Sequence, residues 1–131
     1  MIGIDTNVLV RYIAQDDANQ SQKATQLIES LSAEMPGFVT LVSVVELVWV
    51  MQGCYKATKT ECAAILQTLL RTSEILLENA ELIAQALNSY NLSNADFADC
   101  LIVSCANHAK CSGVMTFDKN AANTAGMLLI E

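Results

Sequence analysis

The sequence predicts an α/β protein in which the strands of a mostly parallel sheet alternate with helices. Short apolar runs, typical of strands buried on both faces, alternate with longer segments whose apolar residues recur at helical spacing. A length of 131 residues, 53 % of them hydrophobic, fits one compact domain with a single core. We therefore expect a three-layer α/β/α sandwich over residues 1–131, with four or five strands and right-handed crossovers.

The first half of the chain supplies two strands and four helices to this scheme. The apolar run Met1 to Ile4 predicts a strand, and it ends abruptly at a polar turn. Pro36-Gly37 ends the second helix and precedes the second strand. The expected elements are, in order, a strand at 1–4, helices at 8–13 and 21–32, a strand at 38–40, and helices at 43–52 and 58–71.

The second half continues the alternation. Ile75-Leu76-Leu77 is the third apolar run, and the last two runs flank a weak helical turn. The segment from Ser93 to Ala106 reads as a helix that is apolar on nearly every side, which is typical of a buried element. The expected elements are a strand at 75–77, helices at 80–90 and 93–106, a strand at 113–116, a helical turn at 121–125 and a strand at 127–130.

Composition excludes several classes of protein. No apolar run approaches the roughly 18 to 20 residues that span a bilayer, and no signal-peptide pattern opens the chain, so we expect a soluble, cytoplasmic protein. Five cysteines without a C-x-x-C pair indicate reduced, mostly buried thiols. The single histidine, His108, is expected at a helix end on the surface.

The charge balance argues against nucleic-acid binding by a broad basic surface. Fourteen acidic and seven basic residues give a net charge of −7. Either the partner is not a polyanion, or cations and local basic groups mediate its approach. The bases available are Arg11, Lys23, Lys56, Lys59, Arg71, Lys110 and Lys119.

Four carboxylates occupy unusual places: Asp5 and Asp118 follow apolar strands, and Glu46 and Asp99 lie within apolar helices. Helix capping is an alternative explanation for most of them. Asp5 and Asp118 can cap the following helices. Ser43 with Glu46, and Ser93 with Asp96, have capping-box spacing. Asp99 escapes this explanation, because a lone carboxylate within an apolar helix needs a partner or a cation.

The topology of a parallel sheet brings these separate observations together. Ligands bind outside the carboxyl ends of the strands, where the following helices also begin. Four carboxylates at one edge repel each other unless a divalent cation neutralises them, and oxygen-only ligands suit Mg²⁺ or Mn²⁺. The chemistry that fits is phosphodiester hydrolysis, in which one or two ions activate a water.

Four ordered motifs then resemble the PIN-domain family, with the closest likeness to VapC-type toxins of toxin–antitoxin pairs. The motifs are Ile4-Asp5-Thr6-Asn7-Val8-Leu9, Ser43-Val44-Val45-Glu46-Leu47, Asp96-Phe97-Ala98-Asp99-Cys100-Leu101-Ile102 and Thr116-Phe117-Asp118-Lys119. The resemblance covers essentially the whole chain. It implies an Mg²⁺- or Mn²⁺-dependent endoribonuclease, a homodimer, and a VapB-like antitoxin whose tail occupies the active-site groove.

The resemblance also implies roles for individual residues. The family's acidic ligands match Asp5, Glu46, Asp99 and Asp118, and an additional acid of many relatives matches Asp96. The polar supporting positions of the family match Thr6, Asn7 and Thr116.

Three other functions stay open at this stage. A receiver-type regulatory domain also binds Mg²⁺ at this sheet edge, but Ile75-Leu76-Leu77 ends without the aspartate that accepts a phosphoryl group. A haloacid-dehalogenase-like phosphatase requires an aspartate where Asn7 stands. A PIN-like module that only binds its partner is the third alternative. The stretch from Trp49 to Tyr55 is interpreted either as helix core or as a surface for a second subunit or an antitoxin helix.

Overall fold

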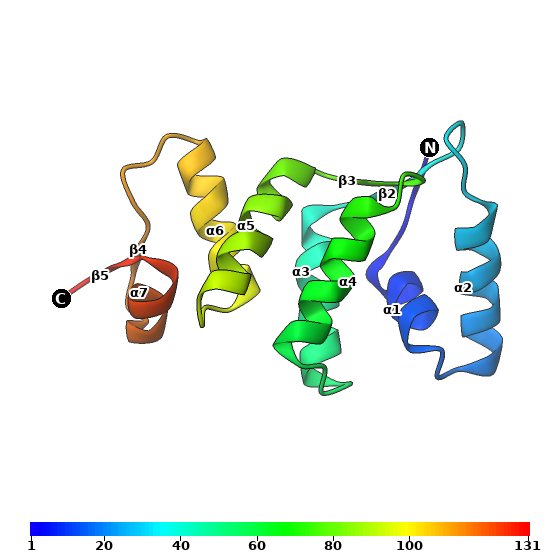
Figure 1. Cartoon of the computed structure of the whole chain (residues 1–131), viewed down its shortest axis with the longest axis horizontal. Helices are drawn as coiled ribbons and strands as arrows, with labels where there is room; N and C mark the ends of the chain where they lie inside the picture. The colour runs from blue at the N-terminus through cyan, green and yellow to red at the C-terminus, as the bar shows by residue number, and fades with distance from the viewer. The chain divides into compact units, whose positions relative to one another are not determined.

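A computed structural model describes every residue from Met1 to Glu131. The chain divides into two compact units, Met1–Glu78 and Asn79–Glu131, which we call the N-terminal unit and the C-terminal unit. Figure 1 colours the N-terminal unit from blue to green and the C-terminal unit from green to red. The expectation of one domain over residues 1–131 stays a prediction, and each unit is described by itself.

The N-terminal unit contains a three-stranded parallel sheet in the order β1-β2-β3. Its strands are β1 (Ile2–Gly3), β2 (Gly37–Val39) and β3 (Ile75–Leu77). Phe38 at the centre of β2 lies opposite Gly3 on one side and Leu76 on the other. β3 has the predicted bounds, β1 is shorter than predicted, and β2 lies one residue earlier than predicted. Val39 of β2 is fully buried.

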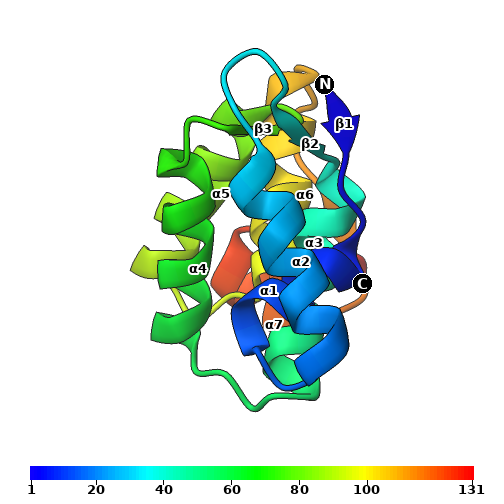
Figure 2. The ribbon, with the colours of Figure 1, turned by 90° about the vertical axis from the view of Figure 1, so that its right-hand side faces the viewer.

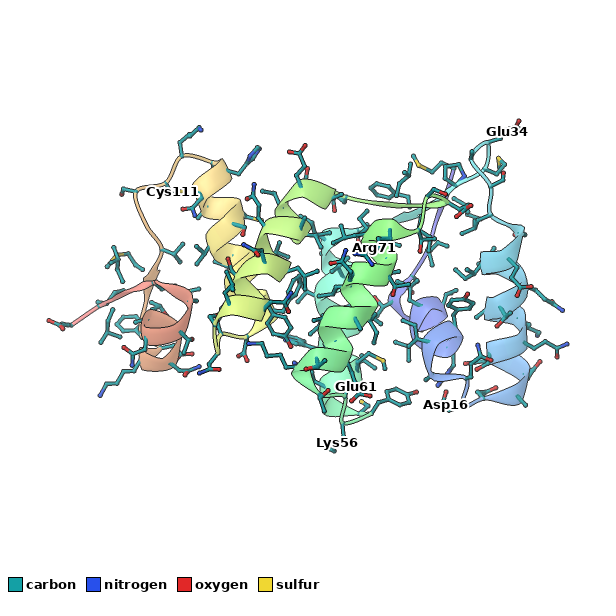
Figure 3. All side chains as sticks on the ribbon, in the orientation of Figure 1. Asp16, Glu34, Lys56, Glu61, Arg71 and Cys111 are labelled. Atoms are coloured by element: carbon teal, nitrogen blue, oxygen red, sulfur yellow. The ribbon has the colours of Figure 1, made fainter.

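Four helices connect these strands: α1 (Thr6–Ala14), α2 (Ala18–Ser30), α3 (Leu41–Gly53) and α4 (Lys59–Arg71). The first two join β1 to β2 and the last two join β2 to β3 (Figure 2). Thr58 and Glu61 form a capping box at the start of α4, where Glu61 is labelled in Figure 3. Among these helices, α1, α3 and α4 bury apolar side chains most deeply: Leu9, Val44, Leu47, Cys62 and Leu66.

The C-terminal unit contains three helices and two short strands. They are α5 (Ala80–Leu92), α6 (Phe97–His108), β4 (Met115–Thr116), α7 (Lys119–Ala125) and β5 (Leu128–Leu129). β4 and β5 pair in parallel. Tyr90 of α5 packs edge-to-face on Phe97 of α6, with ring centroids 5.8 Å apart and planes at 82°. This aromatic pair anchors the start of α6.

The predicted fold class is confirmed: the chain is α/β, with seven helices and parallel strands. The five strands pair as a set of three in the N-terminal unit and a set of two in the C-terminal unit. None of the helices combines the length and apolar character that crossing a bilayer requires.

The predicted start of the helix at Ser93 is wrong, because α6 begins only at Phe97. Ser93 ends α5 instead, and its Oγ accepts a hydrogen bond from the backbone N–H of Ala95 at 3.2 Å. A serine that bonds to nearby backbone groups ends a helix as readily as it begins one. The Ser93-Asp96 capping box is therefore wrong as well.

All five cysteines are free, as expected for reduced thiols. Only Cys62 and Cys100 are buried, whereas Cys54 and Cys111 are exposed, so the expectation that most are buried is wrong. His108 is exposed at the last residue of α6, as predicted.

Candidate functional site

Asp5 joins the end of β1 to the start of α1. Its backbone is extended, with φ −77° and ψ 157°, and its Oδ1 accepts a hydrogen bond from the backbone N–H of Thr6 at 2.7 Å. The capping interpretation of Asp5 is therefore confirmed. The carboxylate is nevertheless exposed, and its other oxygen, Oδ2, accepts no hydrogen bond. Capping α1 leaves that oxygen available to a ligand.

Thr6 connects this turn to α3. The buried Thr6 hydroxyl donates a hydrogen bond to Oε1 of Glu46 at 2.7 Å. Glu46 lies in the second turn of α3, because that helix begins at Leu41, two residues earlier than predicted. A hydroxyl donor fixes the orientation of an exposed carboxylate that would otherwise sample several rotamers.

The capping box predicted for Ser43 and Glu46 is wrong. Thr40 caps α3, and its Oγ1 accepts a hydrogen bond from the backbone N–H of Ser43 at 3.1 Å. Since β2 ends at Val39, Thr40 is the first residue after the strand and takes the cap position. Glu46 therefore has no capping role, and its recorded hydrogen bond is with Thr6.

One open pocket of about 470 Å³ in the N-terminal unit gathers these residues. Four of the predicted site residues line it: Asp5, Thr6, Asn7 and Glu46. The remaining wall is formed by Val10, Arg11, Val50, Cys54 and Tyr55. Two carboxylates with a hydroxyl and an amide form a set of hard oxygen donors, which suits Mg²⁺ or Mn²⁺. We call this the acidic pocket.

In the C-terminal unit, Asp99 is half-buried in the first turn of α6. Desolvation by burial raises the pKa of the Asp99 carboxyl, and the nearby charges of Asp96 and Asp118 raise it further. The charges of Asp96 and Asp118 thus disfavour the ionised form of Asp99. We call these three carboxylates the acidic triplet.

Asp96 occupies the N-cap position of α6, but its side chain makes no capping hydrogen bond. The prediction that Asp96 stands at the start of the helix is thus confirmed, and the prediction that its carboxylate caps the helix is wrong. An exposed aspartate beside the positive end of the helix dipole is stabilised without that bond. The carboxylate oxygens of Asp96 accept no hydrogen bond from the backbone at the start of α6.

Asp118 caps α7, and its Oδ1 accepts hydrogen bonds from the backbone N–H groups of Asn120 at 2.8 Å and Ala121 at 3.3 Å. The capping interpretation is confirmed here. Thr116 supports the same turn, since its Oγ1 accepts a hydrogen bond from the backbone N–H of Asp118 at 3.0 Å. Thr116 therefore orients the segment that carries the carboxylate.

None of the five candidate acids has a basic partner. The recorded ion pair of the chain joins Arg11 to Asp16, at 3.1 Å, and neither residue belongs to the candidate set. Within neither unit do three or more His, Cys, Asp or Glu side chains gather closely enough to hold a metal ion. In each unit the candidate carboxylates therefore carry negative charge that no ion pair offsets.

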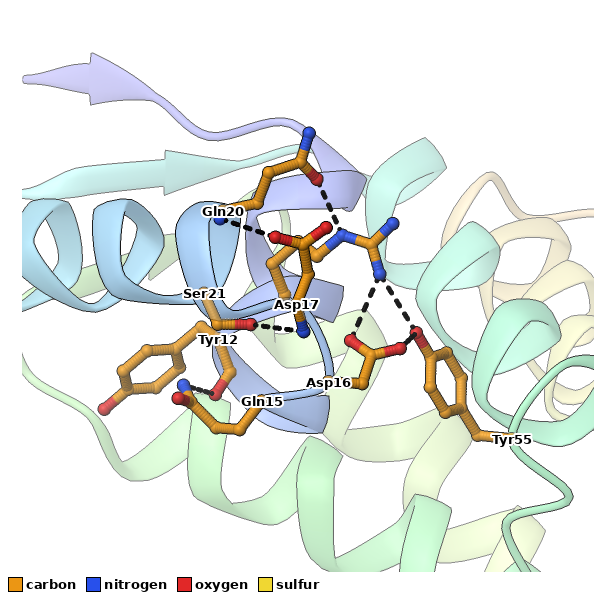
Figure 4. A network of polar contacts seen from close by, with 8 residues as sticks. Tyr12, Gln15, Asp16, Asp17, Gln20, Ser21 and Tyr55 are labelled. Carbon is orange, nitrogen blue, oxygen red and sulfur yellow. Dashed lines mark hydrogen bonds and ion pairs between the residues drawn. The ribbon is translucent and has the colours of Figure 1, made fainter.

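Sequence reasoning missed two groups of residues. Glu78 follows β3, and its Oε1 accepts a hydrogen bond from the backbone N–H of Leu41 at 2.8 Å, which helps to start α3. The sequence did carry a signal for Glu78, because this acid directly follows the apolar run Ile75-Leu76-Leu77, as Asp5 follows the first run. The other group is the network around Arg11 and Tyr55, shown in Figure 4. Tyr55 lies 44 positions after Arg11, so no local pattern in the sequence signals their contact.

The stretch from Trp49 to Tyr55 was interpreted either as helix core or as a surface for a partner, and different residues fit different interpretations. Met51 is buried, in agreement with core packing. Trp49 is 66 % exposed, and Val42, seven residues earlier on α3, is 68 % exposed, so core packing is wrong for Trp49. Residues seven apart lie on the same side of a helix. α3 therefore presents an exposed apolar face.

The sequence was compared with protein families and with curated proteins. The PIN domain family matches residues 2–127, which includes most of both units and all the candidate residues. No curated protein matches the chain. PIN domains are generally nucleases, and they typically depend on divalent metal ions. Because the match extends over nearly the whole sequence, this chain belongs to the PIN-domain family.

Proposed function

We propose that the chain is an endoribonuclease dependent on Mg²⁺ or Mn²⁺, and the VapC-type toxin of a type II toxin–antitoxin pair. One observation carries the chemistry: the Thr6 hydroxyl holds the Glu46 carboxylate in the same open pocket as Asp5. Two oriented carboxylates without a basic partner, in a PIN-domain chain, are suited to bind a cation rather than to stabilise the fold.

The proposed ligands are Asp5, Glu46, Asp99 and Asp118, with Asp96 as an additional acid. These carboxylates would hold a divalent cation, which would supply an activated water and offset charge on the phosphate of the substrate. The chain's own residues position its acids: Thr6 orients Glu46, and Thr116 orients the turn of Asp118. Asn7 lines the acidic pocket and supplies an amide.

The same acids explain how a chain of net charge −7 would accept RNA. Without cations, the acidic pocket and the acidic triplet repel a phosphate backbone. Bound divalent cations would offset this negative charge. The proposal therefore requires that binding of the scissile phosphate and binding of metal depend on the same carboxylates.

Cleavage of a single-stranded RNA by the purified chain is expected with Mg²⁺ or Mn²⁺, and EDTA should abolish it. Glu46→Gln should lower the rate by about 10² to 10³, the loss typical of removing one charge-stabilising group. The measurement is the initial rate of oligonucleotide cleavage. Glu29→Gln is the matched control, because Glu29 is an exposed glutamate of α2 outside the acidic pocket. Equal rates for wild type and Glu46→Gln would contradict the proposal.

The alternatives predict different results in the same assay. A receiver-type domain would take up phosphate from a small phosphodonor, yet Glu78, the acid after β3, is occupied by a hydrogen bond to α3. A haloacid-dehalogenase-like phosphatase would need an aspartate where Asn7 lies. An inert binding module would show no cleavage and no calorimetric Mn²⁺ binding that depends on the acids.

We further propose that the chain forms a homodimer through the exposed face of α3. Val42 and Trp49 are exposed apolar side chains there, and aromatic residues are enriched at protein interfaces. Trp49→Glu should convert a particle of twice the chain mass into a monomer, as measured by light scattering. Leu92→Glu is the control, since Leu92 is 80 % exposed on α5. A wild-type monomer, or a dimer insensitive to Trp49→Glu, would contradict this interface.

A cytoplasmic setting and a VapB-like antitoxin complete the proposal. The support is the resemblance of the four motifs to VapC-type toxins, in which the tail of the antitoxin occupies the active-site groove. A neighbouring reading frame that encodes a small DNA-binding protein would agree with this role. If a co-expressed product of that frame neither binds the chain nor inhibits its cleavage of RNA, the toxin assignment is wrong.

A further inference from the structure

A second pocket, of about 300 Å³, lies beside the acidic pocket in the N-terminal unit. Asn7 and Arg11 line both pockets, so the two share a wall. The second pocket is otherwise lined by Val8, Gln20, Lys23, Ala24 and Leu27 of α1 and α2. Its volume lies at the lower end of the range in which proteins bind small ligands. We call it the basic pocket.

The lining of the basic pocket has the opposite charge from the rest of the chain. Two of the chain's seven bases line it, and none of its lining residues is acidic, although acids outnumber bases two to one. Lys23 is exposed, and its ammonium group has no recorded hydrogen bond or ion pair. An unpaired ammonium beside a guanidinium is the kind of local site that attracts a phosphate.

The Arg11 guanidinium is held in place by three neighbours. Its Nε donates to Oε1 of Gln20 at 2.8 Å, and its Nη1 donates to Oδ1 of Asp16 at 3.1 Å and to the hydroxyl of Tyr55 at 3.2 Å. Tyr55 in turn donates to Oδ2 of Asp16 at 2.6 Å. Figure 4 shows these contacts. Nη2 donates no hydrogen bond within the chain, so a fixed guanidinium keeps one edge available at the wall between the pockets.

We infer that the basic pocket binds a backbone phosphate of RNA next to the phosphate held at the acidic pocket. This inference rests on the proposed function and adds to it the residues that hold the substrate. A strand that enters the acidic pocket passes Asn7 and Arg11, because these residues form the wall it shares with the basic pocket. The contact is with phosphate and is independent of base sequence.

Binding is tested apart from cleavage, with a fluorescent single-stranded RNA at a fixed Ca²⁺ concentration over a series of KCl concentrations. Ca²⁺ also binds carboxylate oxygens but lacks the strict octahedral geometry of Mg²⁺, and a gel checks that the RNA stays intact. Lys23→Gln should weaken binding by between about twofold and fivefold at low salt, as expected for one exposed charge pair. It should also reduce the slope of log affinity against log salt by about 0.7, the value for one phosphate contact on a single strand.

Arg71→Gln is the matched control. Arg71 is an exposed base at the end of α4, labelled in Figure 3, and it lies outside both pockets. Its loss changes the net charge by the same amount, so an unchanged slope would show that Lys23 acts locally. Equal slopes for Lys23→Gln and wild type, equal effects of the two variants, or no binding by the wild type would each overturn the inference.

Metal-dependent cleavage by the wild type is measured in parallel, so that the two failures can be separated. Cleavage together with a salt slope insensitive to Lys23 leaves the proposed function intact and overturns the basic pocket. Absence of cleavage overturns the proposed function itself.

Discussion

Asp99→Asn is expected to slow RNA cleavage strongly and, at the same time, to stabilise the fold. Loss of a proposed cation ligand should lower the cleavage rate by about 10² to 10³. Stability should rise because burial and the charges of Asp96 and Asp118 raise the pKa of Asp99, which means that its ionised form is unfavourable in the folded chain. Asparagine has nearly the same shape and no charge.

The pH dependence follows from the direction of that shift. In the unfolded chain an aspartate titrates near about 3.9, whereas in the folded chain the pKa of Asp99 is higher. The folded state therefore binds more protons between the two values, and wild-type stability falls as pH rises through this window. Asp99→Asn lacks this loss. The two proteins should have similar stability below the window, and the variant should be more stable throughout the range above it.

Thermal unfolding without metal, at pH values from about 4 to 8, measures this difference. We expect the melting temperature of Asp99→Asn to be a few degrees higher than that of wild type at neutral pH. Each kcal/mol added to the free energy of unfolding raises the melting temperature by about 2 to 8 °C. Mn²⁺ should raise the melting temperature of the wild type more than that of the variant, because a ligand stabilises only the state that binds it. Glu29→Gln should behave as wild type. A variant less stable than wild type at neutral pH would contradict the electrostatic origin of the effect.

The sequence allowed Asp99 to be identified because its signal is local. A carboxylate among apolar neighbours in a helix needs a compensating group, whatever the fold. Asp5 and Asp118 were likewise predictable, because each follows an apolar run and precedes a helix that needs a cap. Local rules therefore located these acids and also explained how two of them are held.

The partner of Glu46 could not be predicted from local rules. Thr6 and Glu46 are 40 positions apart, and only the packing of α1 against α3 brings the hydroxyl to the carboxylate. Local spacing offered a capping box with Ser43, three residues away, as an alternative, and the structure excludes it. The contact between Arg11 and Tyr55 spans 44 positions and was missed for the same reason.

Phe97→Ala is expected to cause the largest loss of stability among the substitutions considered. Phe97 is 1 % exposed and meets Tyr90 edge-to-face, so its removal leaves a cavity between α5 and α6. Replacing a buried phenylalanine by alanine costs about 3 to 5 kcal/mol. That is a large part of the roughly 5 to 15 kcal/mol by which domains are stable.

Urea unfolding of the variant measures this cost as a lower midpoint with an unchanged slope. Phe117→Ala is the matched control in the same unit, since Phe117 is 81 % exposed and its truncation should change stability by no more than about 0.5 kcal/mol. Similar losses for the two variants would contradict the packing described for α6. Phe97 also lies between Asp96 and Asp99 in the sequence, so its ring anchors the turn that presents both acids. Its loss should therefore lower metal-dependent cleavage even under conditions where the variant is still folded, because the acids would no longer be held in one arrangement.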